Sequence, residues 1–173
     1  MGCDIHFFCE RFTRDNNYDG PKDISEERNI KLGTLLNDDE VEPRWVSADK
    51  WDYVEYPGDD PYWDLSYNDR FYRGRNYSLF EILAGVRGDD DNAIEPPRGI
   101  PDDASLGYKT VSEQWDGDGH SHSYFTLDEL LDVDWSQYDD RNLYLDEFLA
   151  TIEKMKGIDN DTRNVRCLFF FDN

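Results

Sequence analysis

The chain opens with "MGCDIHFFCE", whose alternation predicts a strand over residues 3–12. Asp4, His6 and Glu10 would then share one face of the strand, and Cys3 and Cys9 would lie on the other, apolar face. An imidazole between two carboxylates is a combination that binds metal ions or moves protons. This face is therefore the first candidate for chemistry.

The second candidate is "DGDGHSHSYF", which holds the other two histidines. A strand over residues 118–125 would place Asp118, His120, His122 and Tyr124 on one face. Side chains two positions apart on a strand point the same way and lie about 7 Å apart. Two imidazoles at that spacing can grip one metal ion after a modest twist.

If the two strands were neighbours, the two sets of side chains would meet in one polar site. The sequence then predicts a divalent cation, Zn or Mn, and a water molecule activated beside it. The expected metal ligands are Asp4, His6, His120 and His122. The expected catalytic residues are His6, Glu10, Asp118, His120 and His122, with Glu10 or Asp118 as the general base.

Two other readings of the histidines stay open. They can be surface groups that only form hydrogen bonds, or a histidine beside a serine in "HSHS" can act as acid or base on a phosphoester without a metal. Paired H-x-[ST] motifs would strengthen the second reading, but residue 8 is Phe, so the first strand lacks one.

A cluster of arginines is the third candidate. "FYRGRNY" and "RGIPDD" set Arg73, Arg75 and Arg98 among aromatic residues and near Asp102, in a chain that is poor in cations. Guanidinium groups and rings suit a phosphate-bearing nucleotide or a carboxylate. We expect these four residues to bind a small anionic ligand, unless the arginines merely pair with the protein's own acids.

The elements that must position these residues indicate an α+β fold. We expect a single domain over residues 1–173, with one mostly antiparallel sheet and about three helices packed on one side. Residues 13–43 form a polar, acidic insert and residues 87–107 a long loop rich in Asp and Pro. The expected strands cover 3–12, 44–56, a hairpin formed by 108–115 and 119–125, and a central strand at 165–171. The expected helices cover 78–86, 126–133 and 142–156, the first two with capping-box spacing.

The charge limits the choice of partners. Forty acidic against eighteen basic residues give a net charge of −22. Such a surface repels nucleic-acid backbones and anionic membranes, so we expect neither as a partner. The acids can serve solubility in high salt, surround a cation-dependent site, or imitate nucleic acid and occupy the basic groove of a host protein.

The cysteines and the apolar runs indicate a compartment. Cys3, Cys9 and Cys167 form no CxxC pair, and an odd number of cysteines fits a reducing cytoplasm. The longest apolar runs, such as "CLFFF", are too short for a signal peptide or a membrane span.

Five segments together resemble a family of small proteins encoded by tailed bacteriophages and prophages. They are "MGCDIH", "WVSADKW", "FYRGRNYSLFEILAGVR", "EPPRGIPDDAS" and "DGHSHSYFTLDELLDVDW", spread from residue 1 to about residue 135. The resemblance implies an origin rather than an activity: expression in the cytoplasm of an infected bacterial or archaeal host.

Two function classes follow from these observations. The first is a phage accessory protein with a His/Asp/Arg polar cleft, a metal-dependent hydrolase of a phosphate-bearing small molecule or nucleotide. The second is an acidic, nucleic-acid-mimicking inhibitor of a host defence or DNA-binding protein. A nucleotide-binding protein without catalysis, which needs the arginines but no base, is a third possibility.

Overall fold

The computed structural model describes residues 2–14, 43–88, 90–141 and 144–173. The predicted insert at 13–43 therefore lies mostly outside the described residues. In chain order the elements are β1 (Ile5–Thr13), β2 (Arg44–Ser47), β3 (Trp51–Val54), β4 (Tyr62–Leu65), α2 (Tyr77–Ala84), η1 (Asp90–Asn92), α3 (Leu106–Trp115), η2 (Asp116–Asp118), β5 (His120–Thr126), α4 (Leu127–Asp132), η3 (Trp135–Arg141), α5 (Asp146–Met155), η4 (Thr162–Asn164) and β6 (Val165–Phe171).

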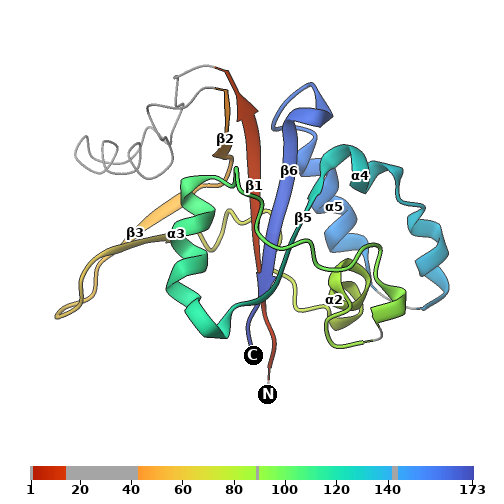
Figure 1. Ribbon diagram of the computed structural model, residues 1–173, viewed down its shortest axis with the longest axis horizontal. Coiled ribbons are helices and arrows are strands. Elements are labelled where there is room, and N and C mark those ends of the chain that lie inside the picture. Colours follow the sequence, from red (N-terminus) through yellow and green to blue (C-terminus); the bar gives the residue numbers. More distant parts are fainter. Residues whose placement is uncertain (1, 15–42, 89, 142–143) are drawn as a thin grey trace.

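The centre of the molecule is a four-stranded antiparallel sheet in the order β2-β1-β6-β5 (Figure 1). All seven residues of β6 are buried. A strand that is apolar on both faces must be covered on both faces, so the prediction that residues 165–171 form a central strand is confirmed. A second, two-stranded sheet pairs β3 with β4.

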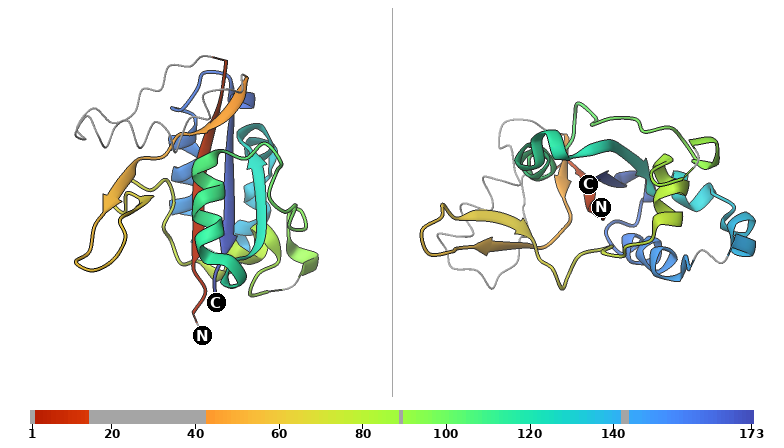
Figure 2. Two further views of the ribbon diagram at one scale, coloured as in Figure 1. Left: turned by 60° about the vertical axis from the view of Figure 1, so that its left-hand side comes forward. Right: turned by 90° about the horizontal axis from the view of Figure 1, so that it is seen from below.

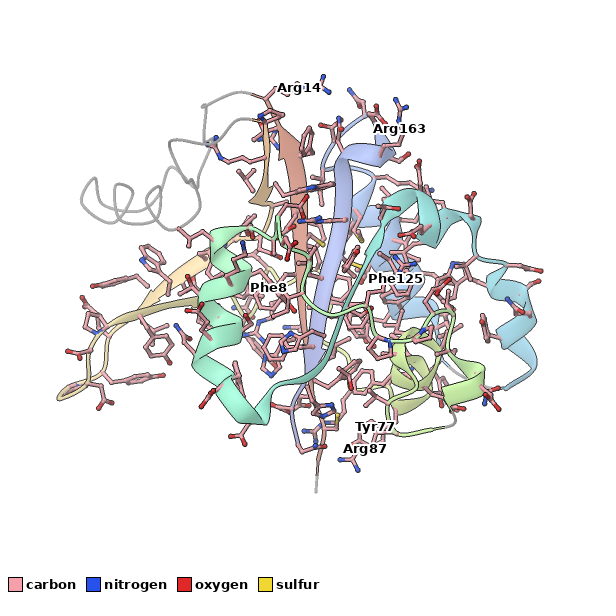
Figure 3. All side chains as sticks on the ribbon, in the orientation of Figure 1. Phe8, Arg14, Tyr77, Arg87, Phe125 and Arg163 are labelled. Atoms are coloured by element: carbon pink, nitrogen blue, oxygen red, sulfur yellow. The ribbon has the colours of Figure 1, made fainter. Side chains whose placement is uncertain are left out.

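The sheet is covered on both faces by different elements. One face packs against α2, α4 and α5 in a core that includes Phe7, Phe125 and Phe169. The other face packs against α3 and the β3–β4 pair in a core around Phe8 and Phe170. Figure 3 shows Phe8 beside α3 and Phe125 on the side of the other three helices. The α+β class and the three helices on one side are confirmed.

The helix on the other face of the sheet, α3, lies where a strand was predicted. The prediction that residues 108–115 form one arm of a hairpin is wrong, because Leu106–Trp115 is a helix. Ser105 caps the helix by accepting a hydrogen bond from the amide of Tyr108, and Tyr108 and Val111, three positions apart, both face the core. The burial of one helical face therefore decides this segment. The "DGDG" stretch that looked like a hairpin turn forms η2 and the approach to β5.

Smaller differences concern the ends of elements. Helix α2 is capped by Asn76, whose side chain accepts a hydrogen bond from the amide of Leu79, so the capping box expected at the start of the helix over residues 78–86 is wrong. The capping box of Thr126 and Glu129 at the start of α4 is confirmed. The predicted strand at 44–56 is interrupted between β2 and β3.

The two ends of the chain lie side by side at one end of the central sheet (Figure 2). Cys3, Cys9 and Cys167 are buried with free thiols, and Cys3 and Cys9 lie on the core side of β1, as predicted. Within the described ranges, no helix combines the length and the apolar character that crossing a bilayer requires.

Candidate functional site

A cleft of about 780 Å³ opens at the end of the sheet where the two chain ends meet. It lies between the start of β1, the C-terminal end of α3 and the β3–β4 pair. Its lining combines acids, arginines, aromatic rings and one histidine: Asp4, Ile5, His6, Tyr62, Asp64, Tyr67, Arg70, Arg73, Gly74, Val111, Gln114, Trp115, Asp118 and Asp172. The volume is within the usual range for small-molecule sites.

His6 is the central titratable group of the cleft. Strand register sets it opposite Phe170, and its ring stacks on that phenyl ring at 4.5 Å between centroids. Trp115 from α3 covers the ring from another side at 4.4 Å. The Nε2 atom lies 3.0 Å from Oδ2 of Asp172. Because an ionised carboxylate can only accept, Nε2 carries the hydrogen, and the lone pair of the neutral ring is on Nδ1.

The carboxylate of Asp172 is itself held in place. Its Oδ1 accepts the amide N–H of Asp4 at 2.8 Å. The side chain of Asp4 in turn takes a bidentate ion pair from Arg75, with N–O distances of 2.6 and 2.7 Å. Hydrogen bonding from Arg75 lowers the pKa of the Asp4 carboxyl. The His6–Asp172 pair is thus supported by a second layer of contacts.

Cations and aromatic rings also line the cleft. The guanidinium carbons of Arg70 and Arg73 lie 5.8 and 5.1 Å from the ring centre of Tyr67. Arg70 also contacts Asp64 at 3.5 Å, and Arg73 donates to the carbonyl of Tyr67. Two guanidinium groups beside exposed tyrosines can hold an anionic group and an aromatic ring together.

The remaining histidines do not join His6. Strand β6, not β5, is the neighbour of β1, so the condition for a shared site is not met. A β-bulge also lies between His120 and His122. The strand pairing shifts between His120 and Ser123, and Ser121 takes a left-handed φ of 51°. A bulge turns the side chains that follow it to the other face.

His120 therefore contacts Phe171 on the α2 face, and His122 contacts Phe170 on the α3 face. The ring of Phe170 lies between His6 and His122. Nδ1 of His122 is 2.8 Å from the hydroxyl of Tyr108, and burial lowers the pKa of His122. His120 lines a separate cavity.

Across the part of the chain that the structure describes, no group of three or more His, Cys, Asp or Glu side chains is arranged to hold a metal ion. The four expected ligands Asp4, His6, His120 and His122 are divided between the two faces of the sheet. Zn or Mn binding stays a prediction from the sequence.

Glu10 has a structural position. Its side chain is buried and accepts from Arg166 Nε at 2.6 Å and from the amide of Ser105 at 2.7 Å. Burial raises the pKa of the Glu10 carboxyl. Arg166 also pairs with Asp103 and lies 4.0 Å from the ring centre of Trp45. Glu10 thereby ties β1 and β6 to the start of α3, away from the cleft.

The other expected residues divide between the cleft and the scaffold. Asp118 and Arg73 line the cleft, and Arg75 borders it through Asp4. Arg98 pairs with Glu129 at 2.9 Å, which fastens the long loop to α4. The carbonyl of Asp102 accepts from Lys109, outside the cleft.

Three residues of the cleft, Asp172, Trp115 and Arg70, were not among the site residues predicted from the sequence. Asp172 is the first polar residue after the apolar run of β6. Pairing that run antiparallel with residues 3–12 would have brought it to Asp4 and His6. Trp115 was hidden by the wrong assignment of α3.

Known proteins add no further information on this site. The chain matches no model of a known protein family, no curated protein and no solved structure. The cleft must therefore be interpreted from its own chemistry.

Proposed function

We propose that the protein is a phage accessory hydrolase that binds a phosphate-bearing small molecule, most suitably a nucleotide, and cleaves a phosphoester bond in it. One observation carries the proposal: the His6–Asp172 pair lies in the same cleft as Arg70, Arg73 and a set of aromatic rings. A base, cations for phosphate and surfaces for stacking are the groups that such a reaction uses.

Binding is assigned to the arginines and the rings. Arg70 and Arg73 would contact the phosphate oxygens, because guanidinium groups donate paired hydrogen bonds to them. Tyr62 and Tyr67 are 39% and 65% exposed, so both offer ring surface to a base. Stacking of a base on an aromatic side chain contributes about 1–3 kcal/mol.

Catalysis is assigned to His6. With the proton on Nε2 held by Asp172, Nδ1 takes a proton from a water molecule as its oxygen forms a bond to phosphorus. The bond from phosphorus to the leaving oxygen breaks, and the imidazolium returns the proton to that oxygen. Arg70 and Arg73 stabilise the negative charge on the phosphoryl oxygens. A well-placed general base contributes about 10²- to 10⁴-fold to the rate.

The protein is further proposed to act in the cytoplasm of an infected host cell. The resemblance to phage-encoded proteins supports this place of action. Three buried cysteines with free thiols also suit a reducing compartment.

The test measures hydrolysis of nucleoside triphosphates and of bis(p-nitrophenyl) phosphate, with and without Mn²⁺ and with a chelator. His6→Asn should lower kcat by about 10²- to 10⁴-fold, and Asp172→Asn should lower it less. Arg73→Met should act mainly on KM. His122→Asn is the matched control, because His122 packs on the same phenyl ring, Phe170, but lies outside the cleft.

Full turnover in folded His6→Asn would refute the catalytic assignment. Nucleotide binding that depends on Arg73 but gives no turnover would refute the proposed hydrolysis and favour the alternative of a nucleotide-binding protein without catalysis. Neither binding nor turnover would refute the proposal as a whole. Far-UV circular dichroism of each variant excludes loss of the fold.

A further inference from the structure

The pair of strands β3 and β4, with the turn between them, forms an arm (residues 51–65) that extends away from the central sheet (Figures 1 and 2). Its base is anchored by Trp51 and Leu65, which are paired across the two strands and buried against the core around Phe8. Farther out, Tyr53 and Trp63 form an edge-to-face pair at 5.0 Å. The arm is thus a fixed extension and its outer part is available to solvent.

The arm exposes aromatic rings. Tyr56 is 58% exposed and Tyr62 is 39% exposed, and both lie beyond the anchored base. Burial of large aromatic rings against a partner lowers the free energy of the complex. Tyrosine is enriched at protein interfaces for this reason. The exposed rings indicate a contact surface.

The charges of the arm define the chemistry of the partner. Residues 51–65 contain five acids, Asp52, Glu55, Asp59, Asp60 and Asp64, and neither lysine nor arginine. Strand register places Asp52 directly opposite Asp64. Like charges opposite each other in a ladder are unfavourable, and Arg70 reaches only one of the two, at 3.5 Å from Asp64. A cation from outside would relieve this repulsion.

The same region already shows which cation fits. Arg70 and Arg73 of this chain lie over Tyr67, the exposed tyrosine that follows the arm. Guanidinium stacks on rings and forks to carboxylates, whereas an ammonium group is a compact, strongly hydrated charge. A surface of tyrosines and carboxylates therefore favours arginine over lysine.

We infer that the β3–β4 arm is a docking surface for an arginine-rich segment of a partner protein. Tyr56 stacks on a guanidinium group, and Asp52, Asp59 and Asp60 accept hydrogen bonds from the guanidinium groups of this segment. The inference is independent of hydrolysis in the cleft, because Tyr56, Asp59 and Asp60 do not line it.

The test uses fluorescence anisotropy with a labelled peptide of alternating arginine and glycine, and an equally charged peptide of lysine and glycine. At about 0.15 M salt, where long-range attraction is screened, the arginine peptide should bind about tenfold more tightly. Tyr56→Ser should weaken this binding about threefold or more. Asp59→Asn/Asp60→Asn should weaken it about tenfold.

Matched controls separate the arm from the overall charge of the protein. Tyr144→Ser changes another highly exposed tyrosine, and Glu113→Gln/Asp132→Asn removes two exposed acids elsewhere. Both controls should bind the arginine peptide like the wild type, and all variants should keep the hydrolytic activity of the wild type.

Equal affinity for both peptides, or equal losses in arm and control variants, would show a nonspecific acidic field and overturn the inference. Absence of saturable binding would overturn it as well. Loss of peptide binding with unchanged turnover in the arm variants would support it separately from the function of the cleft.

Discussion

Replacing Glu10 by Gln tests whether this residue belongs to the scaffold or to the chemistry. Gln keeps the shape of the side chain and can still accept the amide hydrogen of Ser105, but it removes the negative charge that lies 2.6 Å from Arg166 Nε. Both side chains of the pair are almost fully buried, at 5% exposure for Arg166 and 1% for Glu10. The change leaves the buried guanidinium of Arg166 without the negative charge of Glu10.

The expected loss follows from the contacts that remain. Breaking a buried ion pair by removing one partner costs about 3–5 kcal/mol. Arg166 retains Asp103 at 2.9 Å and the ring of Trp45, so we expect the lower end, about 3 kcal/mol. For a chain of this size, that corresponds to a decrease in Tm of roughly 6–12 °C.

Urea denaturation followed by circular dichroism measures the loss. Glu153→Gln is the control, because Glu153 and Lys156 form an exposed ion pair that contributes less than about 1 kcal/mol. The double variant Glu10→Gln/Arg166→Met should lose less than the sum of the two single losses. A loss below about 1 kcal/mol in Glu10→Gln, or unchanged stability with abolished turnover, would refute the structural role.

Three further predictions concern stability. Burial raises the pKa of Asp49 to about 8, so the folded state holds a proton that the unfolded state releases near pH 4. The contribution of this proton to the free energy of unfolding is fully present below about pH 4 and is lost as the pH rises toward 8. Between pH 5 and 8 the wild type should lose about 4 kcal/mol relative to Asp49→Asn, and parallel stability–pH curves would contradict this. A side chain at Gly74 would meet the ring of Tyr72, so Gly74→Ala should lower stability by about 1–3 kcal/mol, and an unchanged Tm would be evidence against that contact. Thr126→Ala removes the capping box with Glu129 and should lose about 1 kcal/mol in urea denaturation, whereas a gain would exclude the cap.

Local signals in the sequence are sufficient to predict several helices and strands. The alternation of residues 3–12 and the apolar run at 165–171 predicted β1 and β6, because a buried strand shows its pattern within a few residues. The capping box at Thr126 likewise depends on contacts within one turn. The arginine-rich stretch "FYRGRNY" predicts a group of anion-binding residues, and Arg73 of this stretch lines the cleft. The binding of an anion stays a prediction.

The error at α3 shows where local patterns fail. Residues 108–115 contain β-branched and aromatic residues that also suit a strand. The cap at Ser105 and the burial of Tyr108 and Val111 against the face of β1 and β6 favour the helix. Tertiary packing therefore outweighs the propensity of such a short segment.

The residue types of the candidate site, histidines, carboxylates and arginines, can be predicted from the sequence. Which of these side chains lie together depends on the tertiary structure. The sheet order places β6 between β1 and β5, which separates His6 from His122 by the ring of Phe170 and brings Asp172 to His6 instead. A single extra residue at Ser121 turns His120 to the opposite face. Strand order and register depend on contacts between residues far apart in the chain, and no local pattern records them.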